Sequence, residues 1–339
     1  MLFGHGDDIA TCEVPIVGNF SSNVWYDGYV ADLQNVVSEA LTDITSYPEP
    51  DARSLRMLLA EVNGVALPNV LVSNGAIEAI YLIAQAWRKS RSLVVVPTFS
   101  EYEDACRIHE HELLFLNEDD FVGVIPDVAD MVWICNPNNP TGRVWTRNQL
   151  LQLLEANPDK LFVIDQSYAT FCTEELLHAT DVLDYSNLII IGSLTKCYAI
   201  PGIRVGYVVS AADNVAQLLQ VRIPWSVNTI AVAVAKHFIV NGDKYPLPLV
   251  RWLTQKEQLC EQLAAIDFVE VLPSETPFFL LRLKRGNAAQ LKQYLIKEYG
   301  LLIRNASNFR GLNASYVRIS PQDDAINQKL VNALKQWKP

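Results

Sequence analysis

Basic residues are too few in this sequence to balance its acidic ones. The 339 residues include 27 lysines and arginines against 38 aspartates and glutamates, which gives a formal net charge of −11 at pH 7. Proteins that bind nucleic acids normally present a basic surface, so this excess of acid argues against a nucleic-acid partner. It does not exclude a small anionic substrate, because a few local arginines decide whether such a molecule binds.

Cysteine pairs and long apolar runs are also missing. The six cysteines are scattered, with no C-x-x-C pair and no metal-ligand spacing, which predicts reduced thiols in a cytoplasmic protein without a metal site. No uninterrupted apolar run reaches the roughly 18 to 20 residues that a helix needs to cross a bilayer. No basic and apolar leader follows Met1, so we expect neither a signal peptide nor a membrane span.

The apolar runs in the middle of the chain lack the apolar–polar alternation of half-exposed strands. Five short runs rich in valine and isoleucine are candidate strands: Leu93–Val96, Val132–Cys135, Leu161–Ile164, Leu188–Ile191 and Val205–Val209. Amphipathic segments around them are candidate helices: Gly75–Arg88, Tyr102–His109, Thr146–Glu155, Ala211–Val221 and Val227–Val240. Strands that are apolar on both faces predict a sheet covered by helices on either side, which is the α/β pattern.

The C-terminal part of the chain has a different pattern. After the proline-rich break at Tyr245–Leu249, a long helical segment extends to about Ile266. Four strand-like and two further helical segments follow: Phe268–Leu272, Phe278–Leu283, Ala288–Tyr299, Leu301–Arg304, Tyr316–Ile319 and Ala325–Trp337. We therefore predict a large domain over residues 45–245 and a small α+β domain over residues 246–339, with residues 1–44 forming an N-terminal arm that packs partly with the small domain.

The strongest chemical signal lies between two of the candidate strands, in the segment Ser193–Tyr207. A lysine in a loop is usually only solvated. Here the hydroxyls of Ser193 and Thr195 flank Lys196, and Arg204 follows eight residues after the lysine. An amine placed just after a buried strand can act as a Schiff-base nucleophile. The hydroxyls and the guanidinium are suitable hydrogen-bond donors to a phosphate group.

Three segments upstream of this one lie at the ends of apolar runs. Ser73–Glu78 opens a helix, so its backbone N–H groups could bind a phosphate, although an ordinary helix cap would have the same sequence. Asn136–Gly142 is a loop after a candidate strand, where ligand contacts collect in α/β sheets. Asp165 ends another strand, and a carboxylate at such a buried position requires a cationic partner.

These four segments occur in the order found in the fold-type I pyridoxal-phosphate enzymes, the aminotransferase-like group, which the chain resembles over nearly its whole length. The resemblance implies pyridoxal 5'-phosphate (PLP) as the cofactor. It also implies a large α/β domain, with a mostly parallel seven-stranded sheet between helices, and a smaller α+β domain. By the same resemblance, the catalytic residues are Lys196, which forms the Schiff base, Asp165, which pairs with the ring nitrogen, and Tyr168.

Further cofactor contacts follow from the same resemblance. Tyr168 and Asn139 are similar to the pair that hydrogen-bonds the ring hydroxyl oxygen, and Tyr102 is similar to the residue that stacks on the ring. The phosphate would be held by six residues: Asn74, Gly75, Ala76, Ser193, Thr195 and Arg204. Tyr47 resembles the tyrosine that reaches the phosphate of the neighbouring subunit, which implies a homodimer.

Within this group the chain is most similar to the threonine-phosphate decarboxylases of cobalamin biosynthesis, with the histidinol-phosphate aminotransferases as near relatives. The likeness is carried by six strings: Gly4–Gly6, Asn19–Asn23, Ser193–Tyr207, Pro224–Asn228, Leu302–Asn305 and Asn308–Leu312. Both relatives act on phosphorylated substrates. The resemblance implies that His5, Asn23, Arg304 and Arg318 bind a phosphorylated amino acid, with Arg304 at its phosphate and Arg318 at its α-carboxylate.

Three functions are compatible with these residues. The first is decarboxylation of O-phospho-L-threonine to aminopropanol phosphate, through an aldimine at Lys196 and a quinonoid intermediate. The second is transamination of histidinol phosphate or a related substrate, and the third is PLP binding by a non-catalytic regulatory protein. The Pro224–Asn228 string favours the decarboxylase, although no motif determines which substrate bond lies perpendicular to the ring. Asp7 and Asp8 stand where these relatives usually have Gly-Asn, and they add negative charge near the expected phosphate site.

Overall fold

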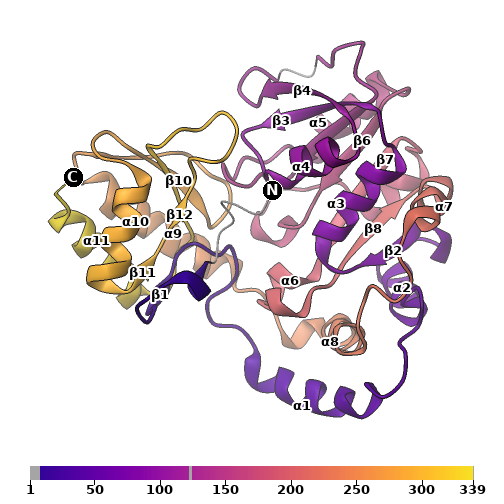
Figure 1. The fold of residues 1–339 in the computed structure, drawn as a ribbon, viewed down its shortest axis with the longest axis horizontal. Coiled ribbons are helices and arrows are strands. Elements are labelled where there is room, and N and C mark those ends of the chain that lie inside the picture. Colours follow the sequence, from indigo (N-terminus) through magenta and orange to yellow (C-terminus); the bar gives the residue numbers. More distant parts are fainter. Residues whose placement is uncertain (1–7, 122–123, 339) are drawn as a thin grey trace.

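Seven strands form the central sheet of the larger of two lobes (Figure 1). The computed structural model describes residues 8–121 and 124–338, and the strand order in this sheet is β2-β8-β7-β6-β5-β3-β4. The strands are β2 Val70–Ser73, β3 Arg91–Val96, β4 Glu112–Asn117, β5 Met131–Cys135, β6 Leu161–Asp165, β7 Leu188–Ser193 and β8 Gly206–Ser210. β8 is antiparallel to both of its neighbours, and the other four pairings are parallel. The mostly parallel seven-stranded sheet expected from the sequence is confirmed.

Both faces of this sheet are buried, which explains why its strands show no apolar–polar alternation. In β5, Trp133 packs in the apolar cluster on one face, whereas Val132 and Ile134 pack in the cluster on the other. Helices α3, α4 and α7 contribute to the first cluster, and α5 contributes to the second. The helices are α3 Gly75–Ala86, α4 Glu101–Ile108, α5 Arg147–Ala156, α7 Ala212–Val221 and, further along the chain, α8 Thr229–Val240. Each of the five overlaps a helix predicted from the sequence.

Several elements of the larger lobe were not predicted from the sequence. The edge strand β4 begins at the exposed Glu112 and is only partly buried along its length, so it lacks a continuous apolar signal. β2 is a strand of four residues. The helices α1 Val30–Ala40 and α2 Arg53–Val62 precede it. α1 packs Leu33 and Val36 against Val234 and Phe238 of α8, at the lower edge of the molecule in Figure 1.

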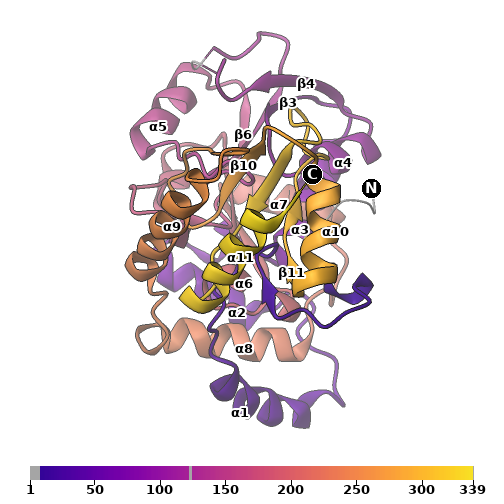
Figure 2. The same cartoon turned by 90° about the vertical axis from the view of Figure 1, so that its left-hand side faces the viewer.

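The smaller lobe is built on a four-stranded antiparallel sheet with the order β12-β13-β10-β9. Its strands are β9 Val269–Val271, β10 Phe279–Leu283, β12 Arg304–Asn305 and β13 Tyr316–Ile319. One face packs against three helices (Figure 2): α9 Leu249–Ala264, α10 Ala288–Tyr299 and α11 Asp324–Gln336. Local signals set the limits of α10. Asn287 accepts a hydrogen bond from the backbone N–H of Gln290 at its start, and Gly300 ends it at a φ of +63°.

The single strand predicted over Leu301–Arg304 is instead two short strands in different sheets. β11 Leu301–Leu302 pairs in parallel with β1 Gly18–Asn19, which attaches the N-terminal segment to the smaller lobe. Two residues later, β12 pairs with β13, and this register places Arg304 directly opposite Arg318. The split therefore brings together two arginines that the sequence separates.

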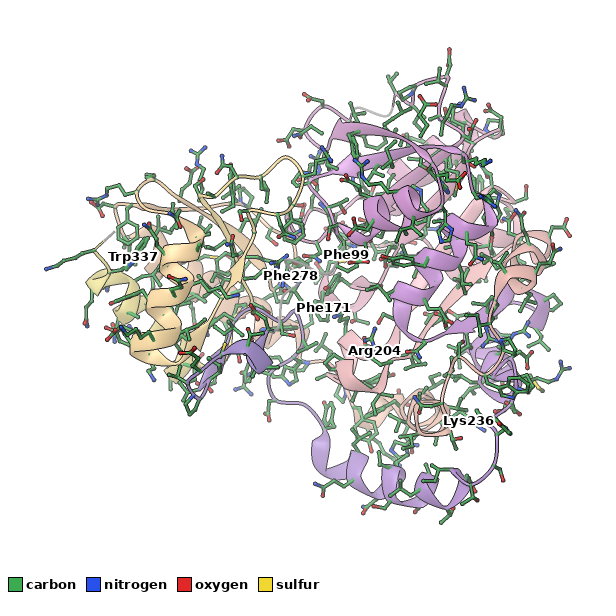
Figure 3. The ribbon with its side chains drawn as sticks, in the orientation of Figure 1. Phe99, Phe171, Arg204, Lys236, Phe278 and Trp337 are labelled. Carbon is green, nitrogen blue, oxygen red and sulfur yellow. The ribbon has the colours of Figure 1, made fainter. Side chains whose placement is uncertain are left out.

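Aromatic side chains fill the junction between the two lobes. Phe171 of the larger lobe contacts Trp252 of α9 at a ring-centroid distance of 5.0 Å, and Tyr168 contacts Phe278 at 5.0 Å. Figure 3 shows Phe171 and Phe278 between the lobes. The domain limits expected at residues 44 and 245 stay a prediction. Across the described ranges, no helix combines the length and apolarity that spanning a membrane requires.

Candidate active site

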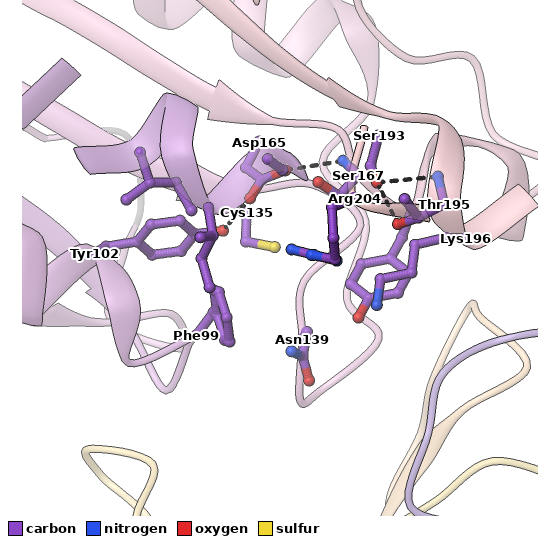
Figure 4. Close-up of a pocket in the computed structure, with 14 residues that line it drawn as sticks. Phe99, Tyr102, Cys135, Asn139, Asp165, Ser167, Ser193, Thr195, Lys196 and Arg204 are labelled. Atoms are coloured by element: carbon purple, nitrogen blue, oxygen red, sulfur yellow. Dashed lines mark hydrogen bonds between the residues drawn. The ribbon is translucent and has the colours of Figure 1, made fainter. Parts of the chain in front are cut away.

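A pocket lies at the carboxyl ends of the parallel strands, facing the smaller lobe (Figure 4). Its lining comes mainly from the segments that follow β3, β5, β6 and β7, and from the first turns of α3. The lining residues are Ala76, Ile77, Ile80, Phe99, Tyr102, Cys135, Asn139, Asp165, Ser167, Tyr168, Ser193, Thr195, Lys196 and Arg204. The space between them is about 570 Å³, which includes space open to solvent.

One end of the pocket is suited to a phosphate. α3 begins at Gly75, so backbone N–H groups of its first turn are available there. Gly75 has a φ of +74°, and a Cβ at this position would lie 2.5 Å from Nη2 of Arg204. Only glycine therefore allows the guanidinium to lie against the helix start. The hydroxyls of Ser193 and Thr195, which are 2.9 Å apart, complete a group of donors for a dianion.

Asp165 is buried on the pocket wall at the end of β6. Its Oδ2 accepts a hydrogen bond from the Tyr102 hydroxyl at 2.6 Å, and its Oδ1 accepts one from the backbone N–H of Ser167 at 2.9 Å. Burial raises the pKa of the Asp165 carboxyl, whereas these hydrogen bonds and the positive charge of Lys196 lower it. A buried carboxylate in such a position favours a cationic group in the adjacent space.

Lys196 lies across the pocket from Phe99 and Tyr102 (Figure 4). It belongs to the one-turn helix α6 Leu194–Cys197, which follows β7 directly. Its Nζ lies 5.7 Å from the centroid of the Tyr168 ring. The amine and the Asp165 carboxylate thus line the same space, which is the arrangement that a pyridine aldehyde with a phosphate tail requires.

Tyr102, expected to stack on a cofactor ring, is tied to its surroundings in two ways. Its ring stacks on Trp133 at 5.8 Å between centroids, and its hydroxyl donates to Asp165. Phe99, three residues earlier, lines the same side of the pocket. Either aromatic face could therefore border a planar ligand, and the sequence alone singled out only Tyr102.

The two expected substrate arginines lie beside this pocket, in the smaller lobe. Arg318 donates to Oδ1 of Asn139 and to the backbone carbonyl of Ser21, both at 2.5 Å. Burial lowers the pKa of Arg318 to about 10. Burial, followed by repulsion from Arg318, lowers the pKa of Arg304 to about 9. Across residues 8–121 and 124–338, neither guanidinium forms an ion pair with a carboxylate. Asn23 is buried close to the Tyr168 hydroxyl.

Six described site residues do not line the pocket: the expected substrate residues Asn23, Arg304 and Arg318 beside it, and the expected cofactor residues Asn74, Gly75 and Tyr47. Gly75 lies directly against Arg204, and Asn74 contributes its side-chain N–H to the backbone carbonyl of Ser226 at 2.8 Å. Tyr47 is 89% exposed and lies against the ring of Trp225 on the surface. His5 is outside the described residues.

Five lining residues were not predicted: Ile77, Ile80, Phe99, Cys135 and Ser167. Each stands within five residues of one that was predicted. Proximity to a strand end or a helix start was thus the available signal. It cannot tell which neighbour faces the ligand, because that depends on the local backbone conformation.

A buried carboxylate supports the loop that carries Asn139. Oε2 of Glu118 accepts hydrogen bonds from the Asn138 amide at 3.0 Å and from the Thr141 hydroxyl at 3.1 Å. Burial raises the pKa of Glu118 to about 7, although these two hydrogen bonds and the positive charge of Arg143 act in the opposite direction. The folded protein therefore holds this proton more tightly than the unfolded chain, in which the pKa is close to 4.5.

Replacing Glu118 with glutamine should stabilise the protein at alkaline pH. The folded protein retains the proton above pH 4.5 and loses it near pH 7, so the wild type loses stability as the pH rises through this window. We expect E118Q to raise the free energy of unfolding by about 1–3 kcal/mol at pH 8 and by little at pH 4.5. Urea unfolding at both pH values measures this, with the exposed Glu112→Gln as control. An equal gain at both pH values would contradict the assignment.

Comparison with known proteins shows to which family the chain belongs. The model of the aminotransferase class I and II family matches residues 15–334. The crystal structure of L-threonine-O-3-phosphate decarboxylase from Porphyromonas gingivalis matches with a TM-score of 0.92 at 45% sequence identity, covering 94% of this chain and 98% of that chain. The match thus includes both lobes and the pocket between them.

Two curated relatives differ in how much of their length is matched. The adenosylcobalamin biosynthesis bifunctional protein CobDQ from Leptospira interrogans is 29% identical over 96% of this chain, which spans only 39% of that protein. The histidinol-phosphate aminotransferase from a Thermoanaerobacter species is 29% identical over 91% of this chain and 88% of that protein. Because the family model covers nearly the whole chain, the protein is a member of the aminotransferase class I and II family, whose enzymes use PLP as their cofactor.

Proposed function

We propose that this protein decarboxylates O-phospho-L-threonine and releases aminopropanol phosphate for cobalamin biosynthesis. The observation that carries the proposal is the 45% identity, over 94% of the chain, to the decarboxylase from Porphyromonas gingivalis. The buried pair Arg304 and Arg318 supports it, because a substrate with a phosphate and a carboxylate brings two anions to two cations.

The pocket offers a group for each part of PLP. Lys196 would hold the cofactor covalently, and the buried Asp165 would keep its ring nitrogen protonated. Asn139 and Tyr168 would contact the ring hydroxyl oxygen, and Tyr102 would border the ring. The phosphate would bind at the start of α3, with six residues as contacts or supports: Asn74, Gly75, Ala76, Ser193, Thr195 and Arg204.

When bound, PLP supplies an electron sink for the pair of electrons left by a bond that breaks at the substrate Cα. The side chains of this protein would decide which bond that is. Arg318 would hold the α-carboxylate and Arg304 the phosphate, so that both ends of the substrate are fixed. The bond between Cα and the carboxyl carbon then breaks and CO2 leaves. Lys196 would deliver the proton that forms the new Cα–H bond.

Transamination is the second candidate, and the similarity to the Thermoanaerobacter histidinol-phosphate aminotransferase favours it. The same residues would serve. If the Cα–H bond were aligned instead, Lys196 would remove that proton, and the amino group would stay with the cofactor until an oxo acid accepted it. The two functions therefore differ in the orientation of the substrate and in the need for a second substrate.

Carbon dioxide release tests the proposal directly. PLP-loaded protein incubated with O-phospho-L-threonine, without any oxo acid, should release CO2 in equal amount to the aminopropanol phosphate formed. Wild-type protein with L-threonine serves as the control, since L-threonine lacks the phosphate that Arg304 would bind. No CO2 release, together with glutamate formation from histidinol phosphate and 2-oxoglutarate, would replace the first function by the second.

We further propose a homodimer in which Tyr47 reaches the cofactor phosphate of the neighbouring subunit. Tyr47 lies outside the pocket of its own chain, beside the exposed apolar side chains of Ile44 and Trp225. Such a cluster suits a protein–protein contact. A monomer in sedimentation equilibrium would contradict this assembly.

The six free thiols agree with the expected cytoplasmic location.

A further inference from the structure

The loop of residues 306–315, between β12 and β13, reaches from the smaller lobe to the larger one. Arg310 at its tip forms two hydrogen bonds with Glu103 of α4, from Nε to Oε2 at 2.7 Å and from Nη2 to Oε1 at 2.6 Å. The same guanidinium lies over the ring of Phe115 in β4, 4.1 Å from its centroid. One side chain of the smaller lobe thus contacts a helix and a strand of the larger lobe.

This contact is better ordered than most ion pairs at a protein surface. Exposed pairs contribute little when two flexible side chains must be held in place. Here the geometry is bidentate, a ring covers the cation, and the side chain of Glu103 is only 19% exposed. The hydrogen bonds of Arg310, and to a lesser extent those of Arg107, lower the pKa of the Glu103 carboxyl. The carboxylate is therefore charged across the neutral range.

The same loop also holds Arg304. Asn308 accepts a hydrogen bond from Nη2 of Arg304 at 2.7 Å, and the guanidinium lies 5.0 Å from the centroid of the Phe309 ring. Phe309 is itself buried, in a small apolar cluster with Leu280 and Ala306. Arg304 is thus supported by the two residues that immediately precede Arg310.

The helix at the other end of the ion pair belongs to the pocket wall. Glu103 follows Tyr102, which lines the pocket and donates a hydrogen bond to Asp165. An unbroken series of contacts therefore extends from Asp165 through α4 and Arg310 to Arg304. Every step in it is a hydrogen bond, a ring contact or a covalent neighbour.

We propose that the Glu103–Arg310 ion pair is a positioning device that sets the affinity of Arg304 for the substrate phosphate, although neither residue touches the substrate. The proposal rests on the function proposed above, because it takes Arg304 as the phosphate-binding residue. Without the pair, loop 306–315 loses its attachment to α4, and Asn308 and Phe309 no longer hold the guanidinium in one orientation. Binding of the phosphate then carries the cost of ordering the loop.

The test measures the affinity of PLP-loaded protein for two ligands, from the change in cofactor absorbance when each ligand binds. O-phosphoethanolamine has an amine and a phosphate but no carboxylate to lose, whereas L-threonine has a carboxylate and no phosphate. In R310Q and in E103Q we expect the Kd for O-phosphoethanolamine to rise roughly 3- to 10-fold, with less than about a twofold change for L-threonine. The double variant should be no weaker than either single variant, because both changes remove one interaction.

Two control variants separate positioning from general loss of charge or stability. R107Q removes the other arginine bound to Glu103 and leaves Arg310 in place. R282Q breaks the Arg282–Glu270 pair on the sheet of the smaller lobe, in which the arginine is about as exposed as Arg310. Both should bind O-phosphoethanolamine as the wild type does, and circular dichroism would verify that all variants are folded.

Three outcomes would overturn the inference. They are an unchanged Kd for O-phosphoethanolamine in R310Q, an equal weakening of both ligands, and additive effects in the double variant. Failure of the proposed function looks different. Wild-type protein that binds O-phosphoethanolamine but releases no CO2 from O-phospho-L-threonine would contradict the decarboxylase alone, while a wild type that binds no phosphorylated amine would overturn both proposals.

Discussion

Replacing Lys196 with alanine is expected to abolish turnover and to leave the cofactor without a covalent bond to the protein. Lys196 lies in the pocket beside Tyr168, and its positive charge acts to lower the pKa of the Asp165 carboxyl. In the proposed function it both anchors PLP and delivers a proton to the substrate, so its loss removes two tasks at once. We expect the rate to fall by about 10³-fold or more. Borohydride reduction followed by mass spectrometry should find the cofactor on the wild-type Lys196 peptide and none on the variant protein.

The matched control for this variant is Lys236→Ala. Lys236 lies on α8, away from the pocket (Figure 3), so the change removes a lysine from the same lobe without altering the pocket. It should retain the wild-type rate and the covalent cofactor. Turnover by K196A at a rate close to that of the wild type would refute the central assignment, since no other lysine lines the pocket within the described parts of the chain.

Replacing Arg318 with glutamine should damage substrate binding far more than it damages folding. The guanidinium is buried, and in the proposed function its partner is the substrate α-carboxylate. Removing one member of a buried, hydrogen-bonded charge pair costs about 2–5 kcal/mol of binding energy. We therefore expect kcat/KM for O-phospho-L-threonine to fall by about 30-fold or more.

The stability of the same variant should change little, because two effects oppose each other. Burial lowers the pKa of Arg318 to about 10. For a base, a lowered pKa means that the folded state disfavours the cation, and this penalty is complete at every pH below about 10. R318Q removes the penalty, but it also removes the hydrogen bonds to Asn139 and Ser21. Thermal unfolding without substrate should show a net change within about 1–2 kcal/mol.

The control for this experiment is Arg282→Gln, on the strand next to Arg318. Arg282 is about half exposed and forms an ion pair with Glu270 at the surface. Its replacement should leave kcat/KM within a factor of about two. A severe loss of stability in R318Q, in proportion to its loss of activity, would indicate a structural and not a substrate-binding role.

Much of the pocket lining could be predicted because its residues occur at local landmarks. Asp165 ends a strand, Asn139 lies in a loop after one, and Lys196 follows a third. In a parallel sheet the carboxyl ends of the strands meet at one edge, so residues at these positions converge whatever the rest of the chain does. The same reasoning accounts for the predicted strands, whose unbroken apolar runs reflect burial on both faces.

The side of the site expected to bind substrate was predictable only as a set of residue types. Arg304 and Arg318 could be named, but their direct opposition depends on the split of Leu301–Asn305 between two sheets. No periodicity within that segment indicates where one pairing stops and the next begins. The pairing partners β1 and β13 decide it, and they come from opposite ends of the chain.

Sequence alone thus determined the α/β class, most of the helices and strands, and nine of the fourteen residues that line the pocket. These properties follow from local patterns of burial, turns and reactive groups along short segments. Tertiary structure alone decided which charged groups meet. Arg318 contacts Asn139 across 179 residues, and Arg310 contacts Glu103 across 207. Such contacts depend on how the two lobes pack. The residues next to an arginine in the sequence do not show whether its guanidinium binds a substrate, an amide or a carboxylate of the other lobe.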